Sequence, residues 1–221
     1  MSSSQWYQQS VDEVAQCLNT SVEGLGADDA KKRLVQYGLN RLPEEKGTHP
    51  VVIFLRQFAS PLIYILLIAA VVTFLLEEYK DTIVIAAVLT INAVVGFVQE
   101  YRAEESVMAL RKMVVPRARV VRDGHEMEVN SDELVPGDVV VLTSGAKVPA
   151  DLRIVSSLEL KIDESMLTGE SLPAEKASQA IEEDNLTPGD QRNMVFMGSV
   201  VVSGRGRGYV VETASRTVLG G

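Results

Sequence analysis

Four consecutive residues, Thr168-Gly169-Glu170-Ser171, place one carboxylate between two hydroxyl-bearing side chains. Gly169 can adopt backbone conformations that other residues avoid, so the chain can turn sharply there. A carboxylate that projects from such a turn can accept a proton from water, which is the task of a general base. Turns of this composition also occur on many protein surfaces, where Gly and Ser serve turn geometry alone. From these four residues, both interpretations stay open.

Two long stretches without a formal charge, residues 57–76 and 82–99, follow the first quarter of the chain. As helices they would be about 30 Å and 27 Å long, which is enough to cross the hydrocarbon core of a bilayer. Core helices of soluble proteins usually keep a polar stripe, whereas residues 63–76 have almost no polar side chain beyond Tyr64 and Thr73. The sequence therefore predicts a membrane protein with two spanning helices.

Charges around this predicted hairpin indicate its orientation. Arg56 precedes it and Arg102, Arg111 and Lys112 follow it, while the turn at residues 77–81 has one Lys and three acids. Because positive charge favours the cytoplasmic side, both termini are expected in the cytoplasm.

The two predicted helices differ in how they begin and end. The first is expected to begin near Gln57, with Pro61 in its first turns. The second continues past the bilayer as far as residue 113, since Pro116 is the first helix-breaking residue after it. Gly96 is expected where the helices pack closely.

The first forty residues have the pattern of two short helices, at 11–18 and 27–37. Ser10 and Glu13 are spaced as a capping box at the first helix, and Gly38 stands where a helix C-cap belongs. The expected packing residues of this segment are Cys17, Ala30, Leu34 and Tyr37.

From residue 117 the apolar residues alternate with a period of two, which is typical of strands. Asp123-Gly124 predicts a tight hairpin, and further strands are expected at 139–142, 152–155, 194–202 and 209–212. Residues 204–208 are interpreted as a Gly-rich hairpin loop, and 178–193 as an exposed excursion. Asp138 and Asp151 are expected to cap turns rather than to bind a metal ion. These strands suggest a jelly-roll-like β domain over residues 117–212.

Residues 163–171, followed by Pro173, closely resemble the actuator-domain signature of P-type cation-transporting ATPases. The corners Val-Pro-Gly-Asp at 135–138 and Val-Pro-Ala-Asp at 148–151 resemble the same domain, and Tyr-Gly-x-Asn-x-Leu at 37–42 is similar to the N-terminal segment of P2-type pumps. The resemblance implies that Glu170 positions the water that hydrolyses an aspartyl-phosphate. It also implies that Thr168, Gly169 and Ser171 shape the loop.

The resemblance covers only part of such a pump. No Asp-Lys-Thr-Gly-Thr stretch with an acceptor aspartate is present, so the 221 residues alone are expected to be inactive as an ATPase. The chain is expected to bind no cofactor or metal itself, and the resemblance implies that Mg²⁺ and ATP are bound by other parts of the complete pump. The net charge is −9, and the sequence contains no basic stripe. Nucleic acid is therefore not an expected partner.

The expected organisation is that of an α+β membrane protein: a cytosolic helical segment at 1–50, a transmembrane hairpin with its stalk at 51–115, the actuator domain at 116–213 and a linker at 214–221. Its expected partners are the lipid bilayer and the remainder of the pump. Three interpretations of the whole chain stay open: the N-terminal part of a cation pump, a non-catalytic membrane-anchored module that binds or regulates another protein, or a chain that complements a separately encoded remainder. The transported cation is not determined, because its ligands are expected in later helices.

Overall fold

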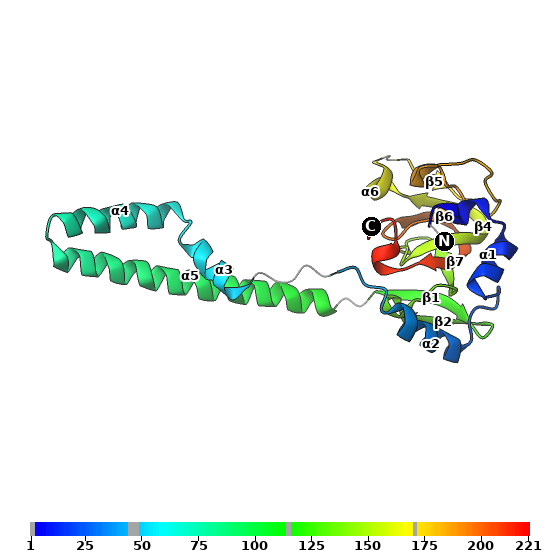
Figure 1. Cartoon of the computed structure of the whole chain (residues 1–221), viewed down its shortest axis with the longest axis horizontal. Coiled ribbons are helices and arrows are strands. Elements are labelled where there is room, and N and C mark those ends of the chain that lie inside the picture. Colours follow the sequence, from blue (N-terminus) through cyan, green and yellow to red (C-terminus); the bar gives the residue numbers. More distant parts are fainter. Residues whose placement is uncertain (1–2, 44–48, 114–115, 170–171) are drawn as a thin grey trace. The chain divides into compact units, whose positions relative to one another are not determined.

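The computed structural model describes residues 3–43, 49–113, 116–169 and 172–221. The chain forms two compact units, one of residues 45–114 and one that combines residues 1–44 with 115–221. The first is helical and the second is built around a β-sheet (Figure 1). The fold therefore belongs to the α+β class, and the N-terminal helices form one unit with the sheet.

The helical unit contains α3 (Pro50–Gln57), α4 (Pro61–Leu75) and α5 (Tyr79–Met113), and both α3 and α4 pack against α5 (Figure 1). The prediction that the first apolar helix begins near Gln57 was wrong. α3 ends at Gln57, Ser60 has an extended backbone (ψ 135°), and α4 begins at Pro61 with a bend of 63° between the two helices. The break follows from Pro61, because proline disfavours a helical conformation in the residue before it.

Residues Tyr79–Val107 of α5 form one helix long and apolar enough to cross a membrane, and α3 with α4 would count as a second span if the bent pair is taken as one. α5 continues without interruption to Met113, as predicted from the position of Pro116, although it begins three residues earlier than expected. Gly96 lies against Gln57, where an added Cβ would overlap the amide oxygen of that side chain. The expected close packing at Gly96 is therefore confirmed.

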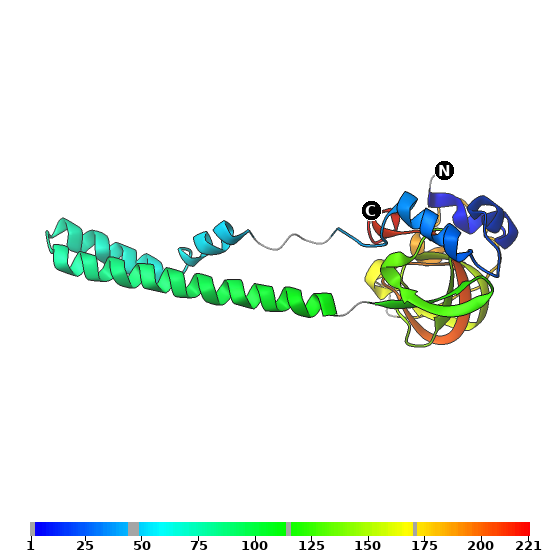
Figure 2. The ribbon, with the colours of Figure 1, turned by 90° about the horizontal axis from the view of Figure 1, so that it is seen from below.

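The second unit contains a seven-stranded antiparallel sheet in the order β2-β1-β3-β7-β4-β5, with β6 paired to β4. The sheet curls strongly (Figure 2). Its first hairpin has the predicted Asp123-Gly124 turn, in which both residues have positive φ (50° and 75°). The strands are β1 (Arg117–Arg122), β2 (His125–Asn130), β3 (Val139–Thr143), β4 (Asp151–Asp163), β5 (Ala174–Glu175), β6 (Met194–Val195) and β7 (Val200–Glu212).

The prediction of a hairpin loop at residues 204–208 was wrong, because β7 runs through these residues without a break. The strand β4 is also longer than predicted, and the two strands pair over most of their length. Gly204 (φ +80°) lies at a bulge where Glu159 and Leu160 of β4 face this single residue, and an added Cβ would overlap the carbonyl of Glu159. Glycine inside a strand often marks such a bulge, whereas sequence alone favours reading it as a loop.

The predicted strand at 194–202 was also incorrect as a single element. It is divided into β6 and the start of β7 by a turn in which Gly198 has a φ of +94°. Residues 178–193 form the expected excursion, which contains one short 3-10 helix, η3 (Pro188–Asp190). Short 3-10 helices also occur as η1 (Ser3–Gln8), η2 (Ser131–Glu133) and η4 (Ala214–Arg216).

Both faces of the sheet are covered by apolar side chains. Along β3, for example, Val140 and Leu142 belong to one buried cluster, and Val139 and Val141 to another. Successive residues of a strand point to opposite faces, so the two clusters lie on the two sides of the sheet. The second cluster includes Tyr7 of η1 and four residues of the helix α1 (Val11–Leu18), which cover that face (Figure 2).

The two N-terminal helices have the predicted bounds, α1 at Val11–Leu18 and α2 at Ala27–Tyr37, and the capping box of Ser10 and Glu13 is present. Two of the expected packing residues are exposed instead. Cys17 lies on the solvent side of α1, and Tyr37 stacks under the guanidinium of Arg216 at 5.0 Å. The helical spacing predicted both residues near the apolar stripe of their helix. The packed face of each helix is narrower than this prediction.

Candidate functional site

Thr168 and Gly169, the first half of the predicted catalytic motif, lie in a helical turn directly after β4. This turn is α6 (Ser165–Thr168), and Gly169 (φ +74°) ends it by donating its N–H to the carbonyl of Ser165 at 3.0 Å. Glu170 and Ser171 lie outside the described residues, so their predicted roles stay predictions. The described part agrees with a sharp turn at Gly169, as expected for glycine in this conformation.

The start of the turn is fixed by side-chain and backbone hydrogen bonds. The carboxylate of Asp163, the last residue of β4, accepts from the N–H of Ser165 at 2.9 Å. Hydrogen bonds from the side chain and the backbone of Ser165 lower the pKa of Asp163 below its usual value. The carbonyl of Glu164 then accepts from the N–H of Thr168 at 3.0 Å and from its hydroxyl at 3.2 Å. The polar atoms of Thr168 are thus tied back to the end of the strand.

The side chain of Glu164 forms a buried ion pair with Lys176. The ammonium nitrogen lies 2.7 Å from Oε1 and 2.8 Å from Oε2, and the exposed fractions of the side chains are 3% for Glu164 and 0% for Lys176. Burial raises the pKa of Glu164 and lowers the pKa of Lys176, while each charge opposes the shift of the other. The pair closes the chain segment 164–176 at its base, where β5 also pairs with β4.

The turn rests on two other parts of the unit. Leu167 packs against the second apolar cluster, which also contains Tyr7 and residues of α1. Gly189 of η3 lies under Thr168, where an added Cβ would come within 2.9 Å of the Thr168 methyl group. Two long apolar side chains next to the motif are instead exposed, Met166 at 72% and Leu172 at 84%. The turn α6 is therefore supported by contacts at Leu167 and Thr168, whereas Met166 and Leu172 remain exposed.

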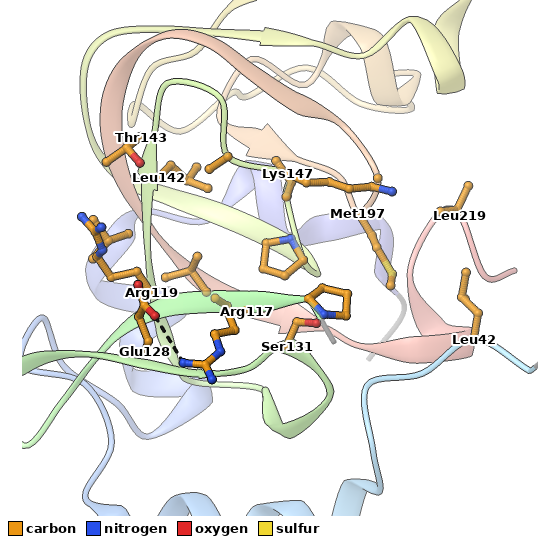
Figure 3. A pocket seen from close by; sticks show the side chains of 18 residues that line it. Leu42, Arg117, Arg119, Glu128, Ser131, Leu142, Thr143, Lys147, Met197 and Leu219 are labelled. Atoms are coloured by element: carbon orange, nitrogen blue, oxygen red, sulfur yellow. Dashed lines mark ion pairs between the residues drawn. The ribbon is translucent and has the colours of Figure 1, made fainter. Parts of the chain in front are cut away.

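A separate apolar pocket of about 430 Å³ lies in the same unit, between the diverging ends of β1 and β3 (Figure 3). In β1, only Val120 and Val121 pair with β3. The pocket lies where the two strands separate, and its lining includes Ala118, Leu142 and Met197. At its side, Arg117 forms an ion pair with Glu128 at 3.6 Å (Figure 3). None of the described residues of the segment 164–176 lines this pocket, so the pocket is distinct from the turn α6.

The described residues contain no group of three or more His, Cys, Asp or Glu side chains that could hold a metal ion. Asp138 caps its own turn, as predicted, by accepting from the N–H of Val135 at 3.0 Å, and it also forms an ion pair with Arg122. Asp151 accepts from Met197 and Val218, which are distant in the chain, rather than from its own turn as predicted. Both carboxylates are therefore occupied by structural contacts.

Sequence reasoning missed the Glu164–Lys176 pair and two further buried polar residues, Asn40 and Arg153. Arg153 is fully buried and donates to the carbonyls of Trp6, Gln9 and Ser178, among others. Burial lowers its pKa to about 10. All three sets of contacts join segments that are far apart or irregularly spaced in sequence, so no periodic pattern pointed to them.

Two sequence models of known families match the chain. The model of the P-type ATPase actuator domain matches residues 112–221, and the model of the cation transporter/ATPase N-terminus matches residues 6–73. The first match contains β1 to β7 and the whole motif, and the second contains α1, α2 and most of α4.

Curated relatives show the same likeness. The chain is 47% identical over 198 residues to a probable cation-transporting ATPase F of Mycobacterium tuberculosis (strain ATCC 25618 / H37Rv), which is 89% of this chain and 22% of that protein. It is 40% identical over 209 residues to a calcium-transporting ATPase of Bacillus subtilis (strain 168), with 94% and 24% covered, and 42% identical over 223 residues to a calcium-transporting ATPase 1 of Bacillus cereus (strain ATCC 10987 / NRS 248), with 98% and 25% covered.

The chain thus spans about a quarter of the length of these relatives or slightly less. The two family matches together cover residues 6–73 and 112–221, which is most of the sequence. The chain belongs to the family of P-type cation-transporting ATPases.

Proposed function

We propose that the chain is the N-terminal and actuator part of an ATP-driven cation pump, and that its Thr-Gly-Glu-Ser motif acts in dephosphorylation of an aspartyl-phosphate. The observation that carries this proposal is the match of the actuator-domain model to residues 112–221, which contain the motif directly after β4. The exposed apolar side chains Met166 and Leu172 support it, because they suit a turn that contacts another part of the pump.

In this proposal Glu170 is the catalytic residue. Its carboxylate accepts a proton from a water molecule while the oxygen of that water attacks the phosphorus, and the aspartate leaves as a carboxylate. Thr168, Gly169 and Ser171 set the course of the backbone on either side of it. Mg²⁺ and ATP would be bound by the phosphorylation and nucleotide-binding parts of the pump, as the resemblance to P-type ATPases implies.

We also propose that the helical unit crosses the bilayer twice, by α3 with α4 and by α5, and that both termini face the cytoplasm. The excess of Lys and Arg outside the connecting turn supports this orientation. Cys17, the only cysteine of the chain, is exposed and can report the side of the N-terminal unit.

A membrane-impermeant maleimide tests the orientation. It should label Cys17 in inside-out vesicles and leave it unlabelled in sealed right-side-out vesicles. In a Cys17→Ser/Glu78→Cys variant, which moves the thiol to the turn between α4 and α5, the accessibility should be reversed. Labelling of both positions from the same side would contradict two spans.

The dephosphorylation role is tested in a full-length P-type ATPase that contains this segment. With Glu170→Gln, the phosphoenzyme should form from ATP and then decay at least about 100-fold more slowly, because the water loses its general base. The matched control is Glu175→Gln, which removes an exposed carboxylate five residues away and should leave the decay unchanged. Rapid decay of the Glu170→Gln phosphoenzyme would refute the proposed role.

A further inference from the structure

The ion pair between Glu164 and Lys176 is placed where it can control the motif. Glu164 immediately precedes the turn α6, and Lys176 immediately follows β5, so the pair joins the two ends of the chain segment that contains the motif. Both side chains are at least 97% buried, and the ammonium nitrogen of Lys176 lies 2.7 and 2.8 Å from the two carboxylate oxygens of Glu164. The two residues form a clamp at the base of the segment 164–176.

Stability alone does not explain a buried ion pair. Removing two charges from water is costly, and replacing such a pair by apolar side chains of similar volume is often neutral or stabilising. What the pair supplies is direction, because a charge-assisted hydrogen bond fixes the distance and angle between its two groups. An apolar contact of the same size would let the two ends of the segment slide against each other.

Further contacts extend the clamp to the motif. The N–H of Lys176 donates to the carbonyl of Leu160 in β4, and its ammonium lies 3.4 Å from the carbonyl of Gln191, directly after η3. On the other side, the backbone of Glu164 holds Thr168 through the hydrogen bonds described above. Because Gly189 of η3 also lies against Thr168, one ion pair connects the strand, the excursion and the turn.

We propose that the Glu164–Lys176 pair is a positioning element that fixes the orientation of the Thr168–Gly169 turn on the sheet, and that the dephosphorylation step depends on it. The inference rests on the proposed function, since it assigns the pair to the same reaction. Neither residue touches the reacting atoms in this proposal, and both act through the turn.

The first test measures the turn itself and does not depend on any pump activity. In the full 221-residue chain in detergent, Glu164→Leu/Lys176→Met should keep the fold but raise amide hydrogen exchange in residues 165–169 and 172–175 by about tenfold or more. Exchange in β7 should stay unchanged. The matched control is Glu126→Leu/Arg207→Met, which removes an ion pair with the same 2.7 Å separation on the exposed surface. Unchanged exchange in both segments would overturn the clamp.

The second test separates positioning from folding and uses a full-length pump that contains the segment. The double variant should form phosphoenzyme from ATP at the normal rate and lose it about tenfold more slowly, because small misplacements of a catalytic group cost this much. A purely structural role would lower phosphoenzyme formation and decay together. Normal decay, or equal loss of both steps, would overturn the inference.

Glu170→Gln is measured in parallel, so that the two proposals can fail separately. If Glu170→Gln stabilises the phosphoenzyme while the double variant decays normally, only the positioning inference fails. If Glu170→Gln decays normally, the proposed function fails. Should the double variant not fold, Glu164→Gln takes its place, because it keeps the side-chain volume and one acceptor for the ammonium. By the same argument, the phosphoenzyme of this variant should decay at least about threefold more slowly than normal, and normal decay would overturn the inference.

Discussion

The side-chain oxygen of Asn40 accepts a hydrogen bond at 2.8 Å from the backbone N–H of Ala214, a residue 174 positions later in the chain. The amide nitrogen of Asn40 donates to the carbonyls of Ser131 and Pro149, at 3.0 and 2.8 Å. Asn40 is 3% exposed, so all three partners depend on it rather than on water. It joins the segment after α2, two connections of the sheet and the segment after β7.

Asn40→Ala should therefore destabilise the β unit by about 2–4 kcal/mol, because three polar groups lose a buried partner. Urea unfolding of the full chain, followed by the fluorescence of the single tryptophan, Trp6, measures this change. Trp6 packs against a buried cluster of the same unit and reports its unfolding. Asn130→Ala, an exposed asparagine of β2, is the control and should change the stability by less than about 0.5 kcal/mol. Equal effects of the two substitutions would contradict the role of Asn40.

Gly204→Ala should destabilise the unit by about 2 kcal/mol or more, because a Cβ would overlap the carbonyl of Glu159 at the bulge. Gly145→Ala separates this steric effect from backbone strain. Gly145 has a nearly equal φ of +82° but no atom within 4 Å of an added Cβ, so only about 1 kcal/mol is expected there. The same urea titration measures the stability of both variants. An equal loss of stability would show that the overlap with the carbonyl of Glu159 adds nothing to the effect of backbone strain.

Arg153→Met should release the N-terminal segment from the sheet. The arginine donates to the carbonyls of Trp6 and Gln9, and these lose their donor in the variant. We expect a destabilisation of about 3 kcal/mol, with faster amide hydrogen exchange in residues 6–10. Arg119→Met, which removes an exposed arginine without an ion pair in the described part of the chain, should leave the exchange unchanged. Retained protection of residues 6–10 in Arg153→Met would contradict the prediction.

Asp151 should make the stability of the β unit depend on pH. Its carboxylate is buried, and burial raises its pKa from 3.8 to about 6, although the N–H groups of Met197 and Val218 oppose the shift. A raised pKa in the folded state means that the folded chain binds the proton more tightly than the unfolded chain. The resulting stabilisation is full below about pH 4 and is lost as the pH rises through about 6. Its size is about 3 kcal/mol.

Asp151→Asn removes this titration. The stability difference between the native chain and the variant, measured by urea unfolding from about pH 3 to about pH 7, should therefore move by about 3 kcal/mol in favour of the variant as the pH rises. The comparison cancels the titration of the carboxyl groups that do not interact with Asp151, whereas the nearby charge of Glu212 contributes to the raised pKa and is part of the measured effect. A difference independent of pH would show that Asp151 titrates near its ordinary value in the folded unit.

Much of the local structure follows from short-range patterns in the sequence. Ser10 and Glu13 define the start of α1 because the capping box needs only the residues of one helical turn. Asp123-Gly124 determines the first hairpin for a similar reason, since both residues tolerate the positive φ of the turn. The family signature at residues 163–171 likewise identified the turn after β4 as the candidate site.

Only the tertiary structure decided which distant segments meet. The Gly-rich residues 204–208 have the composition of a loop, but they form part of β7 because β4 pairs with β7 through this region. Glu164 and Lys176 are unremarkable charges in the sequence, and they become a buried pair because β5 returns beside the end of β4. Local patterns reflect the conformational preferences of neighbouring residues, whereas contacts between strands depend on how the whole sheet packs, which no short stretch of sequence contains.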